Sequence, residues 1–187
     1  GLVLNATGSG KTYIAGIFAS RVRGSICFIV DQLDLLEQGK AELERVLGEP
    51  VGYVGNGVFV PQRVTVATVQ TIHGHIRDPK FKRWFRAIDI LIIDEIHVQM
   101  NKRNFKAITK IEPKAVFGLT ATLELSKKDV RIRAYAIAGP VLYEYPLERG
   151  MREGVLAKGK VVRVLYENRV EPSEWAKSYI DEYSEKI

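Results

Sequence analysis

The chain has 187 residues, of which 46% are hydrophobic and 27% charged, and its formal net charge is +6. This length and composition fit one globular domain with a small extension. No apolar run approaches the ~20 residues that a membrane-spanning helix needs, so we expect no membrane partner.

The distribution of charge and the cysteine content indicate the kind of partner and the compartment. Residues 146–187 carry as many basic as acidic side chains, so the positive excess lies in residues 1–145. A basic body favours a polyanionic partner. Cys27, the only cysteine, lies in an apolar run, which predicts a buried thiol, no internal disulfide and a reducing, intracellular compartment.

Apolar runs alternate with segments of helical periodicity along most of the chain. The runs predict strands at 2–4, 26–30, 52–54, 58–60, 64–67, 90–93 and 115–118. Helical spacing predicts helices from about 11 to 22 and at 32–47, 69–76, 79–87, 101–110 and 126–136. In 32–47, the apolar stripe consists of Leu33, Leu36, Leu43 and Leu47. This alternation predicts an α/β fold of three layers, in which helices cover both faces of a mostly parallel sheet.

The character of the chain changes after Gly139 and Pro140. Here we predict an edge strand at 141–145, a short helix at 147–153, a strand at 160–166 and a last helix that begins near 172. The chain lacks an initiator Met and begins one short apolar run before a glycine-rich loop, so we expect a fragment of a longer protein.

That glycine-rich loop spans Asn5–Thr12 and lies between the first predicted strand and the first predicted helix. Gly-Lys-Thr in this context is typical of a phosphate-binding loop. Gly8 and Gly10 lack a Cβ, so the backbone can direct its N–H groups at a phosphate. Lys11 can reach the β- and γ-phosphates, and the Thr12 hydroxyl can bind Mg²⁺. The loop therefore predicts binding of a nucleoside triphosphate.

Two adjacent carboxylates, Asp94 and Glu95, follow the most apolar predicted strand. Ligands of an open parallel sheet collect at the carboxyl ends of its strands, so this pair and the phosphate loop are expected to face one crevice. Asp94 can hold the Mg²⁺ that Thr12 also binds, and Glu95 can orient an attacking water.

Together with the stretch Gly118–Thr122, these motifs make the sequence resemble a known family. It is similar to the first RecA-like domain of superfamily 2 helicases and translocases of the DExH type, over residues 1–145. Motif I corresponds to 6–12, motif II to 94–97 and motif III to 120–122. The stretch 139–147, followed by 154–156, resembles DNA repair and restriction-type members more than RNA helicases.

The resemblance implies a RecA-like P-loop NTPase fold, N-terminally truncated, with residues 146–187 leading toward an absent second RecA-like domain that supplies arginine fingers. It implies ATP and Mg²⁺ as ligands and DNA, rather than RNA, as the partner. The implied ATP-binding residues are Thr7, Gly8, Ser9, Gly10, Lys11 and Thr12. Lys11, Asp94 and Glu95 would be catalytic, with Thr12 and Asp94 at the metal, and His97, Thr120, Ala121 and Thr122 would couple hydrolysis to movement.

Two further stretches resemble the nucleic-acid motifs of this domain: 30–38, which resembles motif Ia, and 67–71, which resembles a later motif. They give Gln32, Thr68, Gln70 and Thr71 as candidate contacts. The polar side chains at 68–71 could instead cap the following helix. Three features depart from the family: Asn5 replaces a smaller residue, Asp31 and Asp34 lie in motif Ia, and the upstream adenine-reading motif is missing.

The segment 77–86 alternates basic and aromatic residues and invites two interpretations. Its rings could stack on bases. However, Phe81, Trp84 and Phe85 have the spacing of a core-facing helical stripe, which favours a buried aromatic face and a solvated basic one.

Three other functions compete with a DNA motor. A P-loop small-molecule kinase would share the phosphate loop but leaves Thr120–Thr122 without a role. The chain could also be a nucleotide- and nucleic-acid-binding module with negligible ATPase activity of its own, or part of a DExH RNA helicase.

Overall fold

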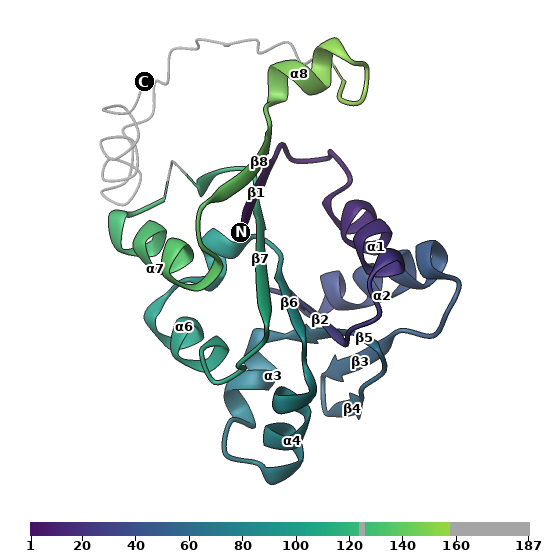
Figure 1. The fold of residues 1–187 in the computed structure, drawn as a ribbon, viewed down its shortest axis with the longest axis vertical. Helices are drawn as coiled ribbons and strands as arrows, with labels where there is room; N and C mark the ends of the chain where they lie inside the picture. The colour runs from purple at the N-terminus through teal and green to yellow at the C-terminus, as the bar shows by residue number, and fades with distance from the viewer. Residues whose placement is uncertain (124–125, 158–187) are drawn as a thin grey trace, which may run out of the picture. The chain divides into compact units, whose positions relative to one another are not determined.

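One eight-stranded sheet, ordered β4-β3-β5-β2-β6-β7-β1-β8, organises the computed structural model, which describes residues 1–123 and 126–157 (Figure 1). Every neighbouring pair is parallel except the β3–β4 hairpin, which confirms the predicted mostly parallel sheet. The strands are β1 (Leu2–Asn5), β2 (Ile26–Val30), β3 (Gly52–Gly55), β4 (Val58–Val60), β5 (Val64–Thr68), β6 (Ile90–Ile93), β7 (Ala115–Thr120) and β8 (Val141–Tyr145).

Helices cover both faces of this sheet, which confirms the predicted three layers (Figure 1). One face carries α1 (Lys11–Arg21) and α2 (Leu33–Leu47). The other carries α3 (Val69–Gly74), α4 (Pro79–Ala87), α6 (Lys102–Ile108) and α7 (Lys128–Ala138). Two shorter helices, α5 (Ile96–Gln99) and α8 (Leu147–Arg152), follow β6 and β8.

Strand β2 shows why the central strands are continuously apolar. All five of its residues are buried, because alternate side chains enter the cores on opposite faces. Phe28 packs in the core beneath α1 and α2, whereas Cys27 and Ile29 pack in the core on the other face. Burial raises the pKa of the Cys27 thiol, which agrees with the predicted inert, buried cysteine.

In both α1 and α2, the buried residues differ in part from those that the apolar spacing suggests. Helix α1 buries the small residues Ala15, Gly16 and Ala19 and leaves Ile14 and Ile17 exposed. A Cβ on Gly16 would lie 2.9 Å from a methyl group of Val46, so this glycine permits the close approach of α2. In α2, the predicted apolar stripe is wrong at Leu33, the first of its four leucines.

Leu36 and Leu43 are fully buried, but Leu33 is 44% exposed. It is the first residue of α2, which begins just beyond the carboxyl end of β2.

The remaining predicted elements agree with the structure within its described part. The hairpin turn at Asn56 and Gly57 has positive φ at both residues, and β8 is an edge strand beside β1. Helix α5 was not expected. The strand predicted at 160–166 and the helix predicted from 172 lie outside the described residues.

A compact unit comprises Gly1–Ala157, and the domain boundary expected after 145 stays a prediction. None of the described helices has the length and apolar character required to cross a bilayer.

Candidate ATP site and nucleic-acid surface

The phosphate loop connects the buried end of β1 to the first turn of α1. Gly8 and Gly10 have φ values of 79° and 77°, in the left-handed region that glycine adopts without strain. Thr7, Gly8 and Gly10 are exposed, and the loop closes on itself where the Ser9 N–H donates to the Ala6 carbonyl at 3.2 Å. The first amides of α1 have no intrahelical partner, so they are available to an anion at this end.

Strand order brings the three motifs to one edge of the sheet. Strand β7 lies between β1 and β6, with Leu4 level with Thr120 and Ile93 level with Gly118. The loop after β1, the carboxylates after β6 and the polar end of β7 are therefore neighbours at the carboxyl ends of parallel strands, where ligands of such sheets bind.

Lys11 and Glu95 are in direct contact across this crevice. Lys11 Nζ lies 3.0 Å from Glu95 Oε1. Glu95 has φ 43° and ψ 54° at the N-terminus of α5, a left-handed conformation that is costly for a residue with a Cβ. This turn points the chain away from β6, so Asp94 and Glu95 reach the phosphate loop from a rigid strand end.

Asp94 is the more buried carboxylate. Its N–H donates to the Ile29 carbonyl at 2.9 Å, which fixes it at the end of β2. Burial, reinforced by the negative charge of Glu95, raises the pKa of Asp94, whereas the charge of Lys11 lowers it. Asp94 and Thr12 line the same cavity of about 280 Å³. A hydroxyl and a desolvated carboxylate in one hollow suit a hard divalent cation such as Mg²⁺, whose charge favours the ionised carboxylate.

His97 connects motif II to motif III. Its Nδ1 lies 2.8 Å from Thr120 Oγ1 and 3.4 Å from Glu95 Oε2, and its Nε2 lies 3.5 Å from Thr122 Oγ1. Thr120 is fully buried, and its Oγ1 also accepts the Thr122 N–H at 3.2 Å. Three of the residues expected to couple hydrolysis to movement, His97, Thr120 and Thr122, therefore form one hydrogen-bonded cluster.

Ala121 lies apart from this cluster and lines a cavity of about 370 Å³ together with Asn5, Thr7 and Tyr145. Asn5, the atypical loop residue, is 2% exposed, and its Oδ1 has no hydrogen-bond partner among the described residues. Ser9 Oγ is likewise buried without a hydrogen-bond partner among the described residues.

The four candidate nucleic-acid contacts also converge. Gln32, Thr68, Gln70 and Thr71 line one hollow of about 490 Å³ with Asp31 and Asp34. Thr68 is 2% exposed and its Oγ1 accepts the Thr71 N–H at 3.4 Å, so it caps α3 as the alternative interpretation proposed. Gln70 is exposed, and its Nε2 donates to the Asp31 carbonyl at 2.8 Å.

Gln99 is a polar residue of this region that the sequence did not indicate. It is fully buried in α5, and its Nε2 donates to Asp31 Oδ1 at 3.1 Å while its Oε1 accepts from Asn104 at 3.2 Å. It thus connects the helix after the carboxylate pair to the start of motif Ia. Its only sequence signal is that it lies two residues after His97.

The aromatic face of α4 is buried, as the spacing predicted. Phe81 and Phe85 are 4% and 2% exposed, and Trp84 packs edge-on against Phe59 with ring centroids 5.7 Å apart. Phe81 and Phe85 are therefore not available for stacking on bases, and Trp84 is half-buried.

Comparisons with known proteins agree with this geometry. The family model described as "Type III restriction enzyme, res subunit" matches residues 1–125. The chain is 30% identical over 180 residues to a type I restriction enzyme EcoAI endonuclease subunit of Escherichia coli, covering 87% of this chain and 21% of that protein. It is 25% identical over 166 residues to the DNA 3′-5′ translocase XPB2 of Sulfurisphaera tokodaii, covering 88% of this chain and 36% of that protein.

The chain therefore spans only 21% and 36% of the lengths of these two relatives. Among solved structures, it is similar to the Hef helicase domain of Pyrococcus furiosus, with a TM-score of 0.64, 22% identity and coverage of 77% of this chain and 34% of that one. The UvsW helicase of bacteriophage T4 gives a TM-score of 0.59 at 22% identity, covering 75% of this chain and 53% of that one. At these identities the structural likeness shows the fold.

Proposed function

This chain belongs to the family of the type III restriction enzyme res subunit, as a helicase/translocase-like first RecA-like domain, and from this premise we propose that it is the ATP-binding half of a DNA motor. The observation that carries the proposal is the contact between Lys11 and Glu95, with Asp94 beside them at the same strand end. A triphosphate bound on the loop places its terminal phosphate next to both side chains.

The proposed roles follow from charge and reach. The loop amides and Lys11 bind the phosphates, and Lys11 exchanges part of its ion pair with Glu95 for the γ-phosphate. Glu95 then orients a water for in-line attack and accepts its proton. Mg²⁺ held by Thr12 and Asp94 would neutralise charge on the phosphates when bound.

His97, Thr120 and Thr122 are proposed to transmit the state of the nucleotide. A change at Glu95 alters its contact with the His97 ring, and the ring holds the end of β7 through Thr120. On the other side of α5, Gln99 contacts Asp31, beside the surface formed by Gln32, Gln70 and Thr71. This gives a short physical connection between the two sites, with DNA as the proposed cargo.

The proposal for the whole protein includes a second RecA-like domain, of the same intracellular polypeptide, that closes on the ATP. Such a domain supplies arginine side chains to the transition state, a contribution of about 10³–10⁵ in rate in comparable NTPases. We therefore expect the isolated 187-residue chain to bind ATP but hydrolyse it slowly, even with DNA present.

The experiment is ATP hydrolysis by the full-length protein with single-stranded DNA, duplex DNA and RNA compared. Glu95→Gln should lower DNA-stimulated turnover by roughly 10²–10⁴-fold while sparing ATP binding, because the amide cannot accept a proton. Glu148→Gln, an exposed change in α8, is the control and should be neutral. Normal turnover by Glu95→Gln would refute the assignment, and stimulation by RNA alone would favour an RNA helicase.

A further inference from the structure

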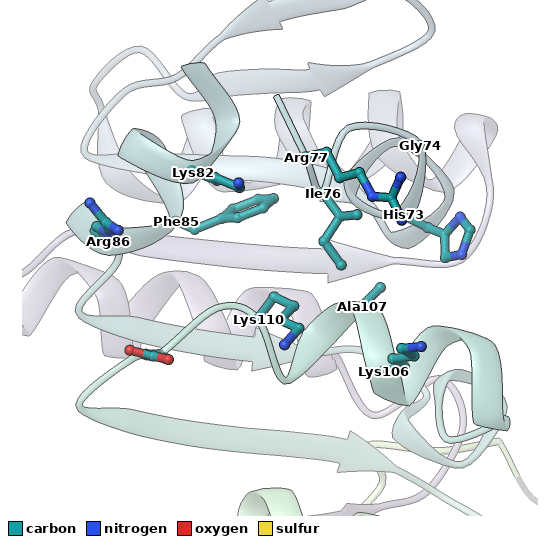
Figure 2. Close-up of a pocket in the computed structure, with 11 residues that line it drawn as sticks. His73, Gly74, Ile76, Arg77, Lys82, Phe85, Arg86, Lys106, Ala107 and Lys110 are labelled. Carbon is teal, nitrogen blue, oxygen red and sulfur yellow. The ribbon is translucent and has the colours of Figure 1, made fainter. Parts of the chain in front are cut away.

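A basic cavity, which neither the motifs nor the proposed chemistry uses, opens between α4 and α6. Figure 2 shows the residues that line it, and its volume is about 780 Å³. Lys82 and Arg86 come from α4, Lys106 and Lys110 from α6 and the residues after it, and Arg77 from the α3–α4 connection. Glu112 is the only carboxylate in the lining.

Among the described residues, the five cations of this cavity have no acidic partner. Within residues 1–123 and 126–157, none of them forms an ion pair, although Lys40, Arg63, Lys114 and Arg133 elsewhere do. All five are exposed. Like charges gathered around one hollow repel each other and produce a focused positive potential. An anionic ligand relieves that repulsion.

The floor of the cavity indicates which part of a nucleic acid would bind. Phe85 lies beneath the cations but is 2% exposed, so no aromatic face is open for stacking on unpaired bases. The rim offers guanidinium and ammonium groups, which bind phosphate oxygens. These features favour the sugar–phosphate backbone of a duplex over the bases of a single strand.

One helix, α3, contributes residues to both this cavity and the candidate nucleic-acid surface. Gln70 and Thr71 at the start of α3 line that surface, whereas His73 and Gly74 at its end line the basic cavity. At about 1.5 Å of rise per residue, Gln70 and Gly74 are separated by only ~6 Å along the helix axis. A duplex that lies on the first surface can therefore extend over the second.

We infer that the basic cavity binds backbone phosphates of duplex DNA, as an extension of the motor's DNA surface. This inference rests on the proposed function only in taking DNA as the partner. Binding at the cavity would not depend on sequence, because phosphates carry no base information. It would be strongly dependent on salt, because each neutralised phosphate releases a counterion.

The test is binding of the 187-residue chain to a fluorescent 20-base-pair duplex over a series of salt concentrations. Arg77→Gln/Arg86→Gln removes two cavity cations, and Arg21→Gln/Arg23→Gln removes two exposed arginines at the end of α1, on the opposite face. The cavity variant should lose roughly 10- to 100-fold in affinity at about 50 mM salt and have a log–log salt slope shallower by ~1.8. The matched control should keep the wild-type slope.

Two further variants sharpen the outcome. Lys82→Gln/Lys110→Gln should reproduce the loss from other walls of the cavity, and Glu112→Gln should raise affinity. Thermal unfolding should be measured to check that each variant folds, and we expect that they do because the substituted residues are exposed. If the cavity and control variants keep equal slopes while the wild type binds duplex, this inference alone fails. If the wild type does not bind duplex at low salt, the proposed DNA function fails with it.

Discussion

The imidazole of His97 lies between the end of β7 and the carboxylate pair: its Nδ1 is 2.8 Å from Thr120 Oγ1 and 3.4 Å from Glu95 Oε2. One ring therefore contacts both the group proposed to activate water and a buried hydroxyl of the neighbouring strand. Any movement of Glu95 toward a substrate therefore changes its contact with this ring.

Replacing His97 with Ala should weaken coupling more than binding. We expect ATP affinity to stay near wild type, and DNA stimulation of turnover in the full-length protein to fall about 5- to 30-fold, corresponding to ~1–2 kcal/mol of coupling. Glu148→Gln, an exposed change in α8, is again the control, since Glu148 lies outside both the ATP site and the candidate nucleic-acid surface. Equal DNA stimulation in both variants would contradict the proposed connection.

Substitutions of Thr68 and Gln70 should distinguish a helix-capping role from contact with nucleic acid. Thr68→Ala removes the hydroxyl that accepts the Thr71 N–H, so denaturant unfolding should show a loss of about 1 kcal/mol. Gln70→Ala changes an exposed side chain and should leave stability within about 0.5 kcal/mol while lowering DNA affinity. If Gln70→Ala binds DNA like the wild type, the hollow it lines is not the nucleic-acid surface.

Gly118 is required by packing, and its replacement should affect both stability and the ATP site. An added Cβ would lie 2.5 Å from Ile96 Cδ1 and 2.8 Å from Leu2 Cδ2. Gly118→Ala is therefore expected to cost about 1–3 kcal/mol in denaturant unfolding, with displacement of α5. Gly74→Ala, where a Cβ meets open space in a helix, should instead stabilise by about 0.4–1 kcal/mol.

The Asp89 carboxylate should make the stability of the fold depend on pH in the acidic range. Its Oδ1 lies 2.7 Å from Lys114 Nζ and its Oδ2 accepts the Ser25 N–H at 2.9 Å, contacts that lower its pKa to about 2. A carboxylate with a depressed pKa stabilises the fold above its unfolded pKa of about 4, and that contribution is lost as pH falls toward 2. Asp89→Asn should thus lower Tm at pH 7.

The deficit of Asp89→Asn relative to the wild type should shrink steadily between pH 4 and pH 2, because the wild-type carboxyl itself becomes neutral over that interval. Differential scanning fluorimetry over this range measures it. A deficit that is constant down to pH 2 would mean that the Asp89 charge contributes nothing.

The sequence predicted those parts of the site that consist of a few consecutive residues. The phosphate loop and the Asp94–Glu95 pair carry their chemistry in a few consecutive residues, and the rule for parallel strands predicted that they would share an edge. The left-handed backbone of Glu95 and the contact from Gln99 to Asp31 were not predictable. The first depends on the turn into α5, and the second joins residues 68 positions apart.

The packing between helices could not be predicted from the spacing of apolar residues either. Helical spacing identified α1, yet its buried contacts come from Ala15, Gly16 and Ala19 because α2 approaches too closely for large side chains. Leu33 has the right spacing for the core but is exposed as the first residue of its helix, just beyond the carboxyl end of β2.

The position of β1 affects how the protein is made. This strand, which carries the phosphate loop, is held between β7 and β8, whose residues 115–120 and 141–145 are synthesised more than a hundred positions later. During translation, Leu2–Asn5 has neither neighbour until most of the domain has left the ribosome, so the nucleotide site cannot be completed before β7 is made. Non-local strand pairing of this kind folds slowly and leaves an apolar strand unpaired meanwhile. A nascent chain halted before residue 115 should therefore fail to bind nucleotide.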